Sequence, residues 1–147
     1  LRALAEVQLQ QGKTVEARKS FQMILDKDPE EPATLSAYAA LLQRLGDPAA
    51  VSTAEKAVRL APAQAEFADV LGWILVQQGQ IDAGVRHLRE ARLRDPANLG
   101  IRFHLAFALA KSGRQSEARE EMSAVLAAPA RGAMPPEMLK LKSELGL

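Results

Sequence analysis

The sequence predicts an all-α fold, an α-solenoid in which antiparallel helix pairs stack one after another. The first observation is composition: 48% of the 147 residues are hydrophobic and only 4% are aromatic, with the alanine and leucine bias of a helix-forming chain. The second observation is an internal repeat with a period of 33 or 34 residues. Its markers are glycines at 12, 46, 79 and 113, small residues at 17, 50, 84 and 118, and prolines at 29, 62 and 96.

Residues 65–98 show one unit of this repeat most completely. Gly79 marks the turn between two helices, Gly84 lies where the helices come closest, and Pro96 ends the second helix because proline cannot continue it. Apolar and small residues fall on one face of each predicted helix; they are Ala68, Leu71, Gly72, Leu75, Leu88 and Ala91.

The L-G pair at 71–72, the turn glycine, the small residue and the D-P at 95–96 resemble a tetratricopeptide (TPR) repeat at the family's own length. Gly84 departs from that pattern, because most units of the family carry alanine there. The resemblance implies a single domain over 1–147, a right-handed superhelix of about three and a half repeats. It also implies a protein-interaction scaffold that is not an enzyme.

The first two units follow the same register with local changes. The first, 1–31, is truncated, and Thr14 is the expected N-cap of its second helix. The second, 32–64, is one residue shorter after its glycine, where Asp47 and Pro48 are expected as N-cap and first helical residue.

The fourth unit, 99–129, is followed by a loop and a last helix within 130–147. Met138, Leu141 and Leu145 form one apolar stripe on that helix. A solenoid needs such a cap, since its final repeat would otherwise leave a core face in water. We therefore expect a capping helix over 136–145 at the end of the protein.

The other end of the sequence begins inside a helical pattern, so we expect a fragment of a longer chain. Leu1, Leu4 and Leu9 form an unfinished apolar face. We expect a preceding repeat to cover this face, or the fragment to self-associate through it.

In the TPR family the first helices of successive units line a concave surface that binds peptides. The resemblance places eight candidate partner-binding residues there: Asp69, Trp73, Val76, Gln77, Phe103, His104, Phe107 and Lys111. Three of the six aromatic residues are among them, which suggests an exposed aromatic groove for a partner's side chains. The alternative is that these rings pack against neighbouring helices or the C-terminal segment.

The biological context rests on a second resemblance. With LGWIL at 71–75 and IRFHLAFALAKSGR at 101–114, residues 65–147 are similar to the ends of long bacterial TPR proteins of exopolysaccharide and exosortase (PEP-CTERM) systems. This implies polysaccharide or protein-export assembly at the envelope or in the periplasm. A cytoplasmic regulatory or chaperone-type adaptor is one alternative, although Ala37, Ala40 and Val70 replace the residues with which some family members bind a C-terminal carboxylate.

A carbohydrate or small ligand in the aromatic groove is the other alternative, but only Asp69 and Gln77 flank Trp73 with polar groups, which favours a peptide. The sequence gives no support to other classes of function. The net charge of +1 argues against nucleic acid, and no apolar run is long enough for a membrane span. His87 and His104 lie on different helices without a third ligand, so no metal or cofactor is expected, and no catalytic motif occurs.

Overall fold

The computed structural model describes residues 2–129 and 132–147. Leu1, assigned above to the N-terminal edge, and residues 130–131, assigned to the loop before the last helix, lie outside the described part. The described residues form nine helices and no strand, so the predicted all-α solenoid is confirmed. The helices are α1 (Arg2–Gln10), α2 (Thr14–Lys27), α3 (Pro32–Arg44), α4 (Ala50–Leu60), α5 (Ala65–Gln77), α6 (Ile81–Arg94), α7 (Leu99–Lys111), α8 (Gln115–Ala127) and α9 (Pro136–Glu144).

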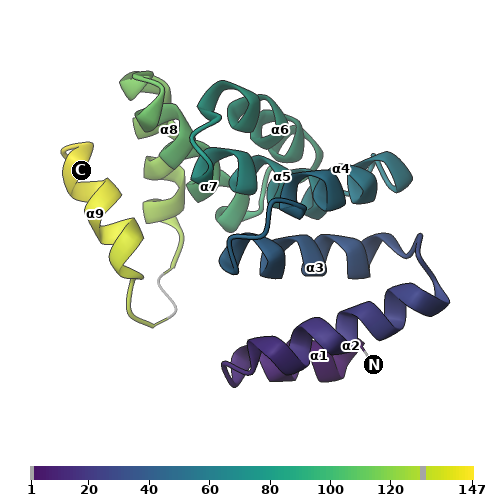
Figure 1. The fold of residues 1–147 in the computed structure, drawn as a ribbon. Coiled ribbons are helices and arrows are strands. Elements are labelled where there is room, and N and C mark those ends of the chain that lie inside the picture. Colours follow the sequence, from purple (N-terminus) through teal and green to yellow (C-terminus); the bar gives the residue numbers. More distant parts are fainter. Residues whose placement is uncertain (1, 130–131) are drawn as a thin grey trace.

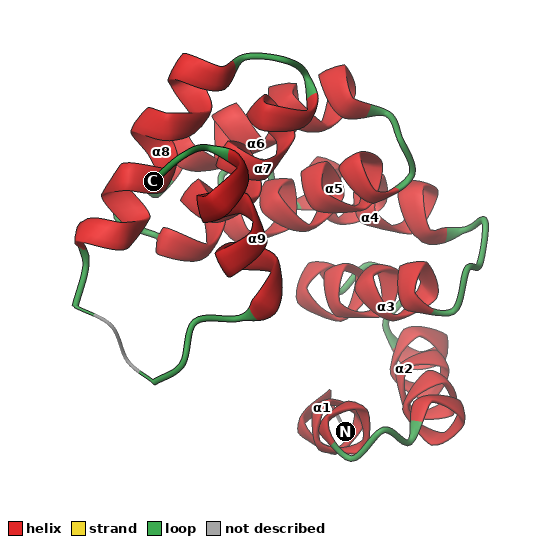
Figure 2. Ribbon diagram, turned by 90° about the vertical axis from the view of Figure 1, so that its left-hand side faces the viewer, coloured by secondary structure: helices red, strands yellow, loops and turns green. Residues whose placement is uncertain are grey.

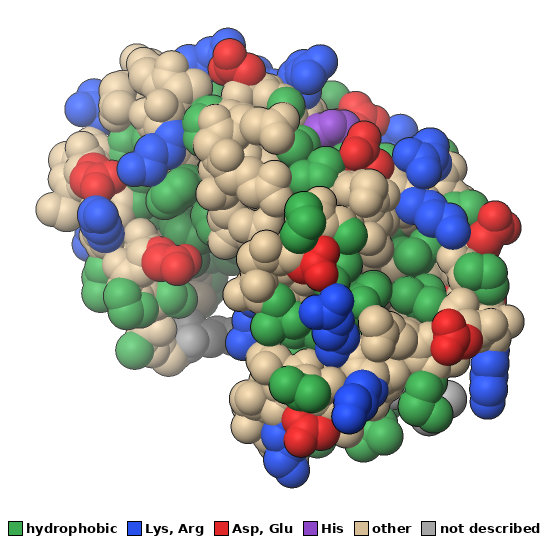
Figure 3. Space-filling view, viewed as in Figure 1, with side chains coloured by type: hydrophobic (Ala, Val, Ile, Leu, Met, Phe, Trp, Pro, Cys, Tyr) green, Lys and Arg blue, Asp and Glu red, His purple; other side chains and the backbone are tan. Residues whose placement is uncertain are grey.

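The first eight helices form four pairs that stack along a curved path (Figure 1). The first helix of each pair packs against its own partner, and α5 also contacts the first helices α3 and α7 of the neighbouring pairs. The curvature places α9 and the α1–α2 pair at opposite ends of an arc. The space-filling view shows the molecule hollowed between these ends, with acidic and basic side chains interspersed over the visible surface (Figure 3).

The turns inside the pairs share one hydrogen-bonding pattern. Gly79 has a φ of 85°, a left-handed conformation that glycine adopts without steric cost. The Gln80 N–H then donates to the Leu75 carbonyl at 2.9 Å, while the Gly79 N–H donates to Val76, which is a Schellman C-cap. The same pattern ends α1, α3, α7 and also α9, where Leu147 N donates to Lys142 O at 3.0 Å.

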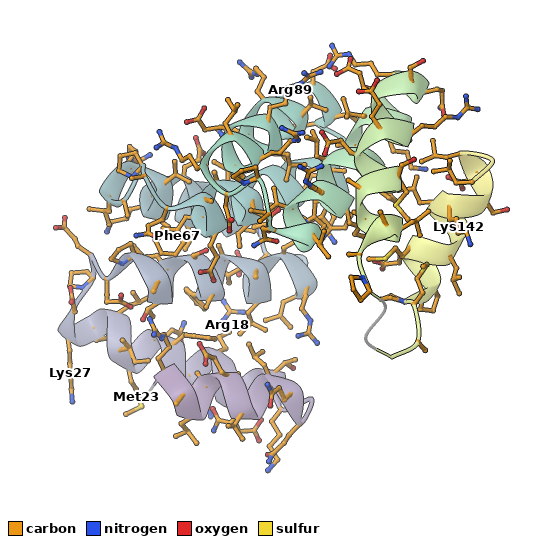
Figure 4. All side chains as sticks on the ribbon, turned by 180° about the vertical axis from the view of Figure 1, so that it is seen from behind. Arg18, Met23, Lys27, Phe67, Arg89 and Lys142 are labelled. Carbon is orange, nitrogen blue, oxygen red and sulfur yellow. The ribbon has the colours of Figure 1, made fainter. Side chains whose placement is uncertain are left out.

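The core is a series of apolar layers between the helices. One layer joins Leu35 of α3, Ala57 of α4 and Phe67 of α5, and Figure 4 shows Phe67 at the junction of these repeats. Ion pairs on the surface add to these contacts: Arg18 of α2 donates to Asp47 at 3.0 Å, across the boundary between the first and second pairs.

Two predicted helix starts are wrong, the first by one residue and the second by two. Thr14 is the first residue of α2, and the N-cap is Lys13 without a side-chain cap, because the Lys13 carbonyl accepts the first helical bond, from the Ala17 N–H at 3.0 Å. At the second start, the Asp47 N–H closes the turn on Leu42, and its carboxylate accepts from the Ala49 N–H at 2.9 Å. Pro48 therefore lies in a turn, and α4 begins at Ala50.

The C-terminal helix caps the stack as predicted. Leu141 and Leu145 are 2% and 1% exposed and Met138 packs beside them in the core layer of α7 and α8. The Arg119 guanidinium of α8 donates to the Leu145 carbonyl at 2.9 Å. Figure 2 shows α9 in front of the helices of the last repeats.

None of the helices within residues 2–129 and 132–147 combines the length and hydropathy that crossing a membrane requires.

A groove over the first helices

Two adjoining hollows lie over the first helices of the pairs, and together we call them the inner groove. The upstream hollow, of about 240 Å³, lies between α3, α5 and α7. The downstream hollow, of about 440 Å³, lies between α5, α7 and α9. Trp73 and Gln77 border both hollows, so a single occupant can extend from one into the other.

Trp73 is the centre of this groove. The His104 ring stacks on its indole, with ring centroids 4.1 Å apart and an angle of 19° between the planes. Phe107 packs edge-on against the same indole at 5.2 Å. Both Trp73 and Phe107 remain half-buried, so each presents part of its ring to the groove. The structure thus brings three of the eight candidate residues, Trp73, His104 and Phe107, into contact.

Asp69 holds His104 in this position. Its Oδ1 lies 2.7 Å from His104 Nδ1, and both side chains are mostly buried, with 17% and 24% exposed. This bond joins α5 to α7, the first helices of adjacent repeats. Because Nδ1 is engaged by the carboxylate, Nε2 is the imidazole nitrogen that remains available to a ligand.

Lys111 gives the downstream hollow a positive charge. Its ammonium lies 5.4 Å from the centroid of the Phe107 ring, a cation–π geometry. Lys111 and Gln77 are both exposed. The hollow therefore combines an apolar floor with a cation at its edge.

Two of the eight candidate residues are buried. Phe103, expected in the exposed aromatic strip, is 6% exposed, so the alternative of packing against neighbouring helices holds for this ring. Val76 is 5% exposed, although it still lines the downstream hollow. Phe103 contacts Trp73 at 6.3 Å between centroids inside the core layer that α7 shares with α8 and α9. Val76 turns toward α6, where it fills the space beside Gly84. These two side chains support the groove floor from within.

One wall of the groove was missed by the sequence analysis. Glu137, Lys140, Leu141 and Glu144 of α9 line the downstream hollow, whereas α9 was expected only to cover the core. The signal was present in the sequence, because Gly146 follows Gly113 by 33 residues. In the structure Gly146 has a positive φ of 70°, as the other turn glycines do. By this spacing α9 occupies the place of the first helix of a further unit.

An aspartate–histidine pair could serve in proton transfer, but no serine, threonine or tyrosine within the described part lines the upstream hollow beside it. Among residues 2–129 and 132–147, no three histidine, aspartate or glutamate side chains converge to hold a metal ion.

Comparison with solved structures shows many chains of the same fold. The chain matches PilW, described as a widely conserved type IV pilus biogenesis factor, with a TM-score of 0.83 and 22% identity over 98% of this chain and 68% of that one. It matches MamA with a TM-score of 0.75 and 18% identity over 97% of this chain and 80% of that one.

It also matches YrrB, described as a TPR protein with an unusual peptide-binding site, with a TM-score of 0.73 and 19% identity over 95% and 70% of the two chains. At these identities the likeness is one of fold. No curated protein matches the sequence.

Three family models, each described as a tetratricopeptide repeat, match residues 2–31, 32–51 and 75–145. The last of these matches extends through α9, in agreement with its place as the first helix of a further unit. From the period of its turns, the geometry of its helix pairs and these three matches, the chain is a tetratricopeptide repeat protein.

Proposed function

We propose that this protein is an interaction scaffold that binds a segment of a partner protein in the inner groove, over Trp73 and Phe107. The observation that carries the proposal is the partial exposure of these two rings, Trp73 at the junction of the two hollows and Phe107 in the downstream one. Aromatic side chains contribute a large share of binding energy where an interface covers them. A continuous floor shared by three first helices suits a segment of several residues.

The contacts of Trp73 favour a peptide over a sugar. Carbohydrates stack on the open face of an aromatic ring, and His104 already occupies one face of this indole. The nearby carboxylate of Asp69 is engaged with the same histidine, which leaves Gln77 as the polar group at the junction. The other free polar groups that line the hollows, such as Arg44 and Lys111, are charged, which suits a peptide better than a neutral sugar.

The cellular context of the scaffold stays a prediction. Assembly of exopolysaccharide or export machinery at the bacterial envelope is supported by the resemblance of residues 65–147. A cytoplasmic adaptor would use the same groove, so the partner's identity will distinguish these contexts.

Site-specific crosslinking in the native host tests the proposal. A photo-crosslinking amino acid replaces exposed Gln77 in the groove or, as a matched control, exposed Arg86 on α6. We expect position 77 to capture a defined segment of one protein, identified by mass spectrometry, and position 86 not to capture it. Equal capture from both positions, or from neither, would place the binding surface elsewhere.

The energetic contribution of the indole can then be measured with the identified segment. Burying one such ring is worth about 1.5–3 kcal/mol, so Trp73→Ala is expected to weaken binding by about tenfold or more. Because Trp73 also packs against Phe103, Trp73→Leu serves as a second variant that keeps apolar volume. Thermal melts of both variants separate loss of binding from loss of folding.

A further inference from the structure

We propose that the segment bound in the inner groove is an acidic as well as apolar peptide, whose carboxylates lie over Arg44 and Lys111. This inference rests on the proposed function, since it names the kind of partner that the same groove receives. It is carried by the position of the two cations, by the pairing of the other charges in the groove, and by the apolar floor beside them.

Arg44 and Lys111 occupy equivalent positions in different repeats. Each lies two residues before a turn glycine, at the last residue of α3 and of α7, and Gln77 holds the same position at the end of α5 between them. All three are exposed and line the groove. Glu144 holds the same position before Gly146 at the end of α9. The turn edge of the groove therefore presents a cation, an amide and a cation over α3, α5 and α7, followed by an anion over α9.

These two cations lack acidic partners in the structure. Within the described ranges, no carboxylate lies within ion-pairing distance of Arg44 or Lys111. Apart from Glu137, the acidic side chains of the groove already have partners: Asp69 is hydrogen-bonded to His104, and Glu144 lies 3.9 Å from Lys140. The ends of α3 and α7 thus offer positive charge to an occupant of the groove.

Glu137 is the remaining acidic side chain of the groove. It belongs to the first turn of α9, about 10 Å along that helix from Glu144 at the turn edge. Its position directs an acidic occupant toward the turn edge and away from the start of α9. The charge distribution therefore gives the bound segment a preferred side.

A basic residue at the end of a helix also offsets the helix dipole, and this alone requires no ligand. Lys111 does more, because its ammonium lies 5.4 Å from the Phe107 ring at the groove floor. A carboxylate that meets Lys111 there brings its neighbouring apolar side chain onto Phe107 and Trp73. Exclusion of water by that side chain strengthens the ion pair, since attraction grows as the local dielectric constant falls.

The spacing of the two cations defines the peptide further. The axes of neighbouring packed helices lie about 8–10 Å apart, so the axes of α3 and α7, which carry Arg44 and Lys111, are expected to be about 16–20 Å apart. An extended chain covers this distance in about six residues. The preferred segment therefore carries two acidic residues about six positions apart, with apolar residues between them.

Synthetic peptides test the proposal directly. The probes are three fluorescein-labelled extended peptides with the same leucine- and alanine-rich centre, which carry glutamate, glutamine or lysine at the two positions about six residues apart. Fluorescence anisotropy with the full chain gives their affinities. We expect the glutamate peptide to bind at least about tenfold more tightly than the lysine peptide, and its affinity to fall with added salt.

Charge reversal supplies the matched variants. Arg44→Glu and Lys111→Glu are each expected to weaken the glutamate peptide by about tenfold and together to reverse the preference in favour of the lysine peptide. Lys19→Glu, on exposed α2 outside the groove, makes the same change in net charge and is expected to leave the affinities unchanged.

The outcomes separate this inference from the proposed function. If all three peptides bind equally and lose affinity in Trp73→Ala, the groove binds apolar segments and the acidic preference is wrong. If the Lys19→Glu control weakens binding as much as Lys111→Glu, the effect is one of net charge, which also overturns the inference. If no peptide binds and groove crosslinking fails as well, the proposed function fails.

Discussion

Gly72 and Gly84 face each other where α5 packs against α6, and neither position has room for a β-carbon. A Cβ atom at Gly84 would lie 2.5 Å from Val76 Cγ2 and 2.9 Å from the Gly72 carbonyl oxygen; one at Gly72 would lie 2.7 Å from Leu88 Cγ. The other pairs have fully buried alanines at the equivalent positions: Ala5 with Ala17, Ala39 with Ala50, and Ala106 with Ala118. The third pair is therefore packed more closely than alanine would allow.

Substitution of Gly84 by alanine is expected to destabilise the protein, although alanine is the family's usual residue there. Overpacking of this kind costs about 1–3 kcal/mol, which exceeds the gain of about 0.5–1 kcal/mol from the better helix propensity of alanine. Urea denaturation measures the difference. Gly100→Ala is the control, because a Cβ there meets only Asn98 Oδ1, at 3.3 Å; an equal loss of stability in both variants would contradict the argument.

The spacing of small residues predicted the contact at Gly84 because a helix pair has a fixed geometry and a close approach recurs once in each period. The same reasoning failed for Phe103. Helical periodicity gives the direction of a side chain, but burial depends on what lies opposite, and here the layer that includes Leu141 and Met122 encloses the ring. That layer contains a helix whose packing the period alone did not specify.

The groove wall on α9 is a second feature that the helical period alone did not specify. Its apolar stripe predicted packing on the last pair, and Leu141 and Leu145 confirm it. The groove wall depends on the residues beside the stripe, such as Lys140 and Glu144. Their place in the groove could be predicted only by recognising Gly146 as the fifth turn glycine of the series, which makes α9 the first helix of a further unit. Side-chain hydrogen bonds across repeats, such as that of Asp69 with His104, could not be predicted because they depend on side-chain reach.

Loss of the Leu141 side chain is expected to release α9 while the four helix pairs stay folded. Leu141 is 2% exposed, and removal of such a side chain costs about 2–5 kcal/mol, but in a solenoid an end unit can unfold separately. Hydrogen exchange should show faster exchange in α9 of Leu141→Ala, with little change in α3 and α5. Leu139→Ala, at a 50% exposed position, is the control, and global unfolding of Leu141→Ala would show that α9 is not a separate unit.

Self-association is expected to depend on the outer face of α1. Leu4 and Val7 are 50% and 45% exposed on this helix, whereas Leu9, expected on the same face, packs against the layer formed with α2 and α3. Sedimentation at rising concentration should detect dimers that disappear in the Leu4→Gln, Val7→Gln double variant. Val15→Gln on α2, 63% exposed, is the control; a strict monomer at all concentrations would disprove this prediction.

His87 is expected to make the protein less stable in mild acid. Burial of its ring, with repulsion from Arg86, lowers the pKa of His87 below its ordinary value, and the attraction of Glu55 opposes this only in part. As the pH falls through the ordinary histidine pKa, the unfolded chain takes up a proton at this site before the folded protein does, so stability falls. Above that pKa both states are neutral and His87 adds no pH dependence.

Urea denaturation at several values between about pH 7 and pH 5 measures this slope, and His87→Gln should reduce it because glutamine does not titrate. An NMR titration of the imidazole resonances reports the pKa of His87 separately from that of His104. A pKa for His87 above the ordinary value, or an unchanged slope in His87→Gln, would contradict the prediction.

The stack of His104 on Trp73 is expected to control the environment of the single tryptophan. The rings lie 4.1 Å apart, and Asp69 fixes the imidazole through a 2.7 Å bond to Nδ1. In His104→Ala one face of the indole becomes accessible to water, so tryptophan emission should shift to the red and acrylamide quenching should increase. Loss of the aromatic pair should also cost about 0.5–1.5 kcal/mol of stability.

Two further variants show whether the position of the His104 ring, or only its presence, protects the Trp73 indole from water. Asp69→Asn keeps the size of the side chain but removes its charge, so the imidazole is held less firmly and quenching should rise to an intermediate level. His87→Ala, on α6, should leave Trp73 emission unchanged. If His104→Ala gives the same emission and quenching as the unmodified protein, the imidazole does not cover the indole in solution. The argument that this face of Trp73 is closed to a stacking sugar would then fail, and a carbohydrate ligand would again compete with a peptide for the groove.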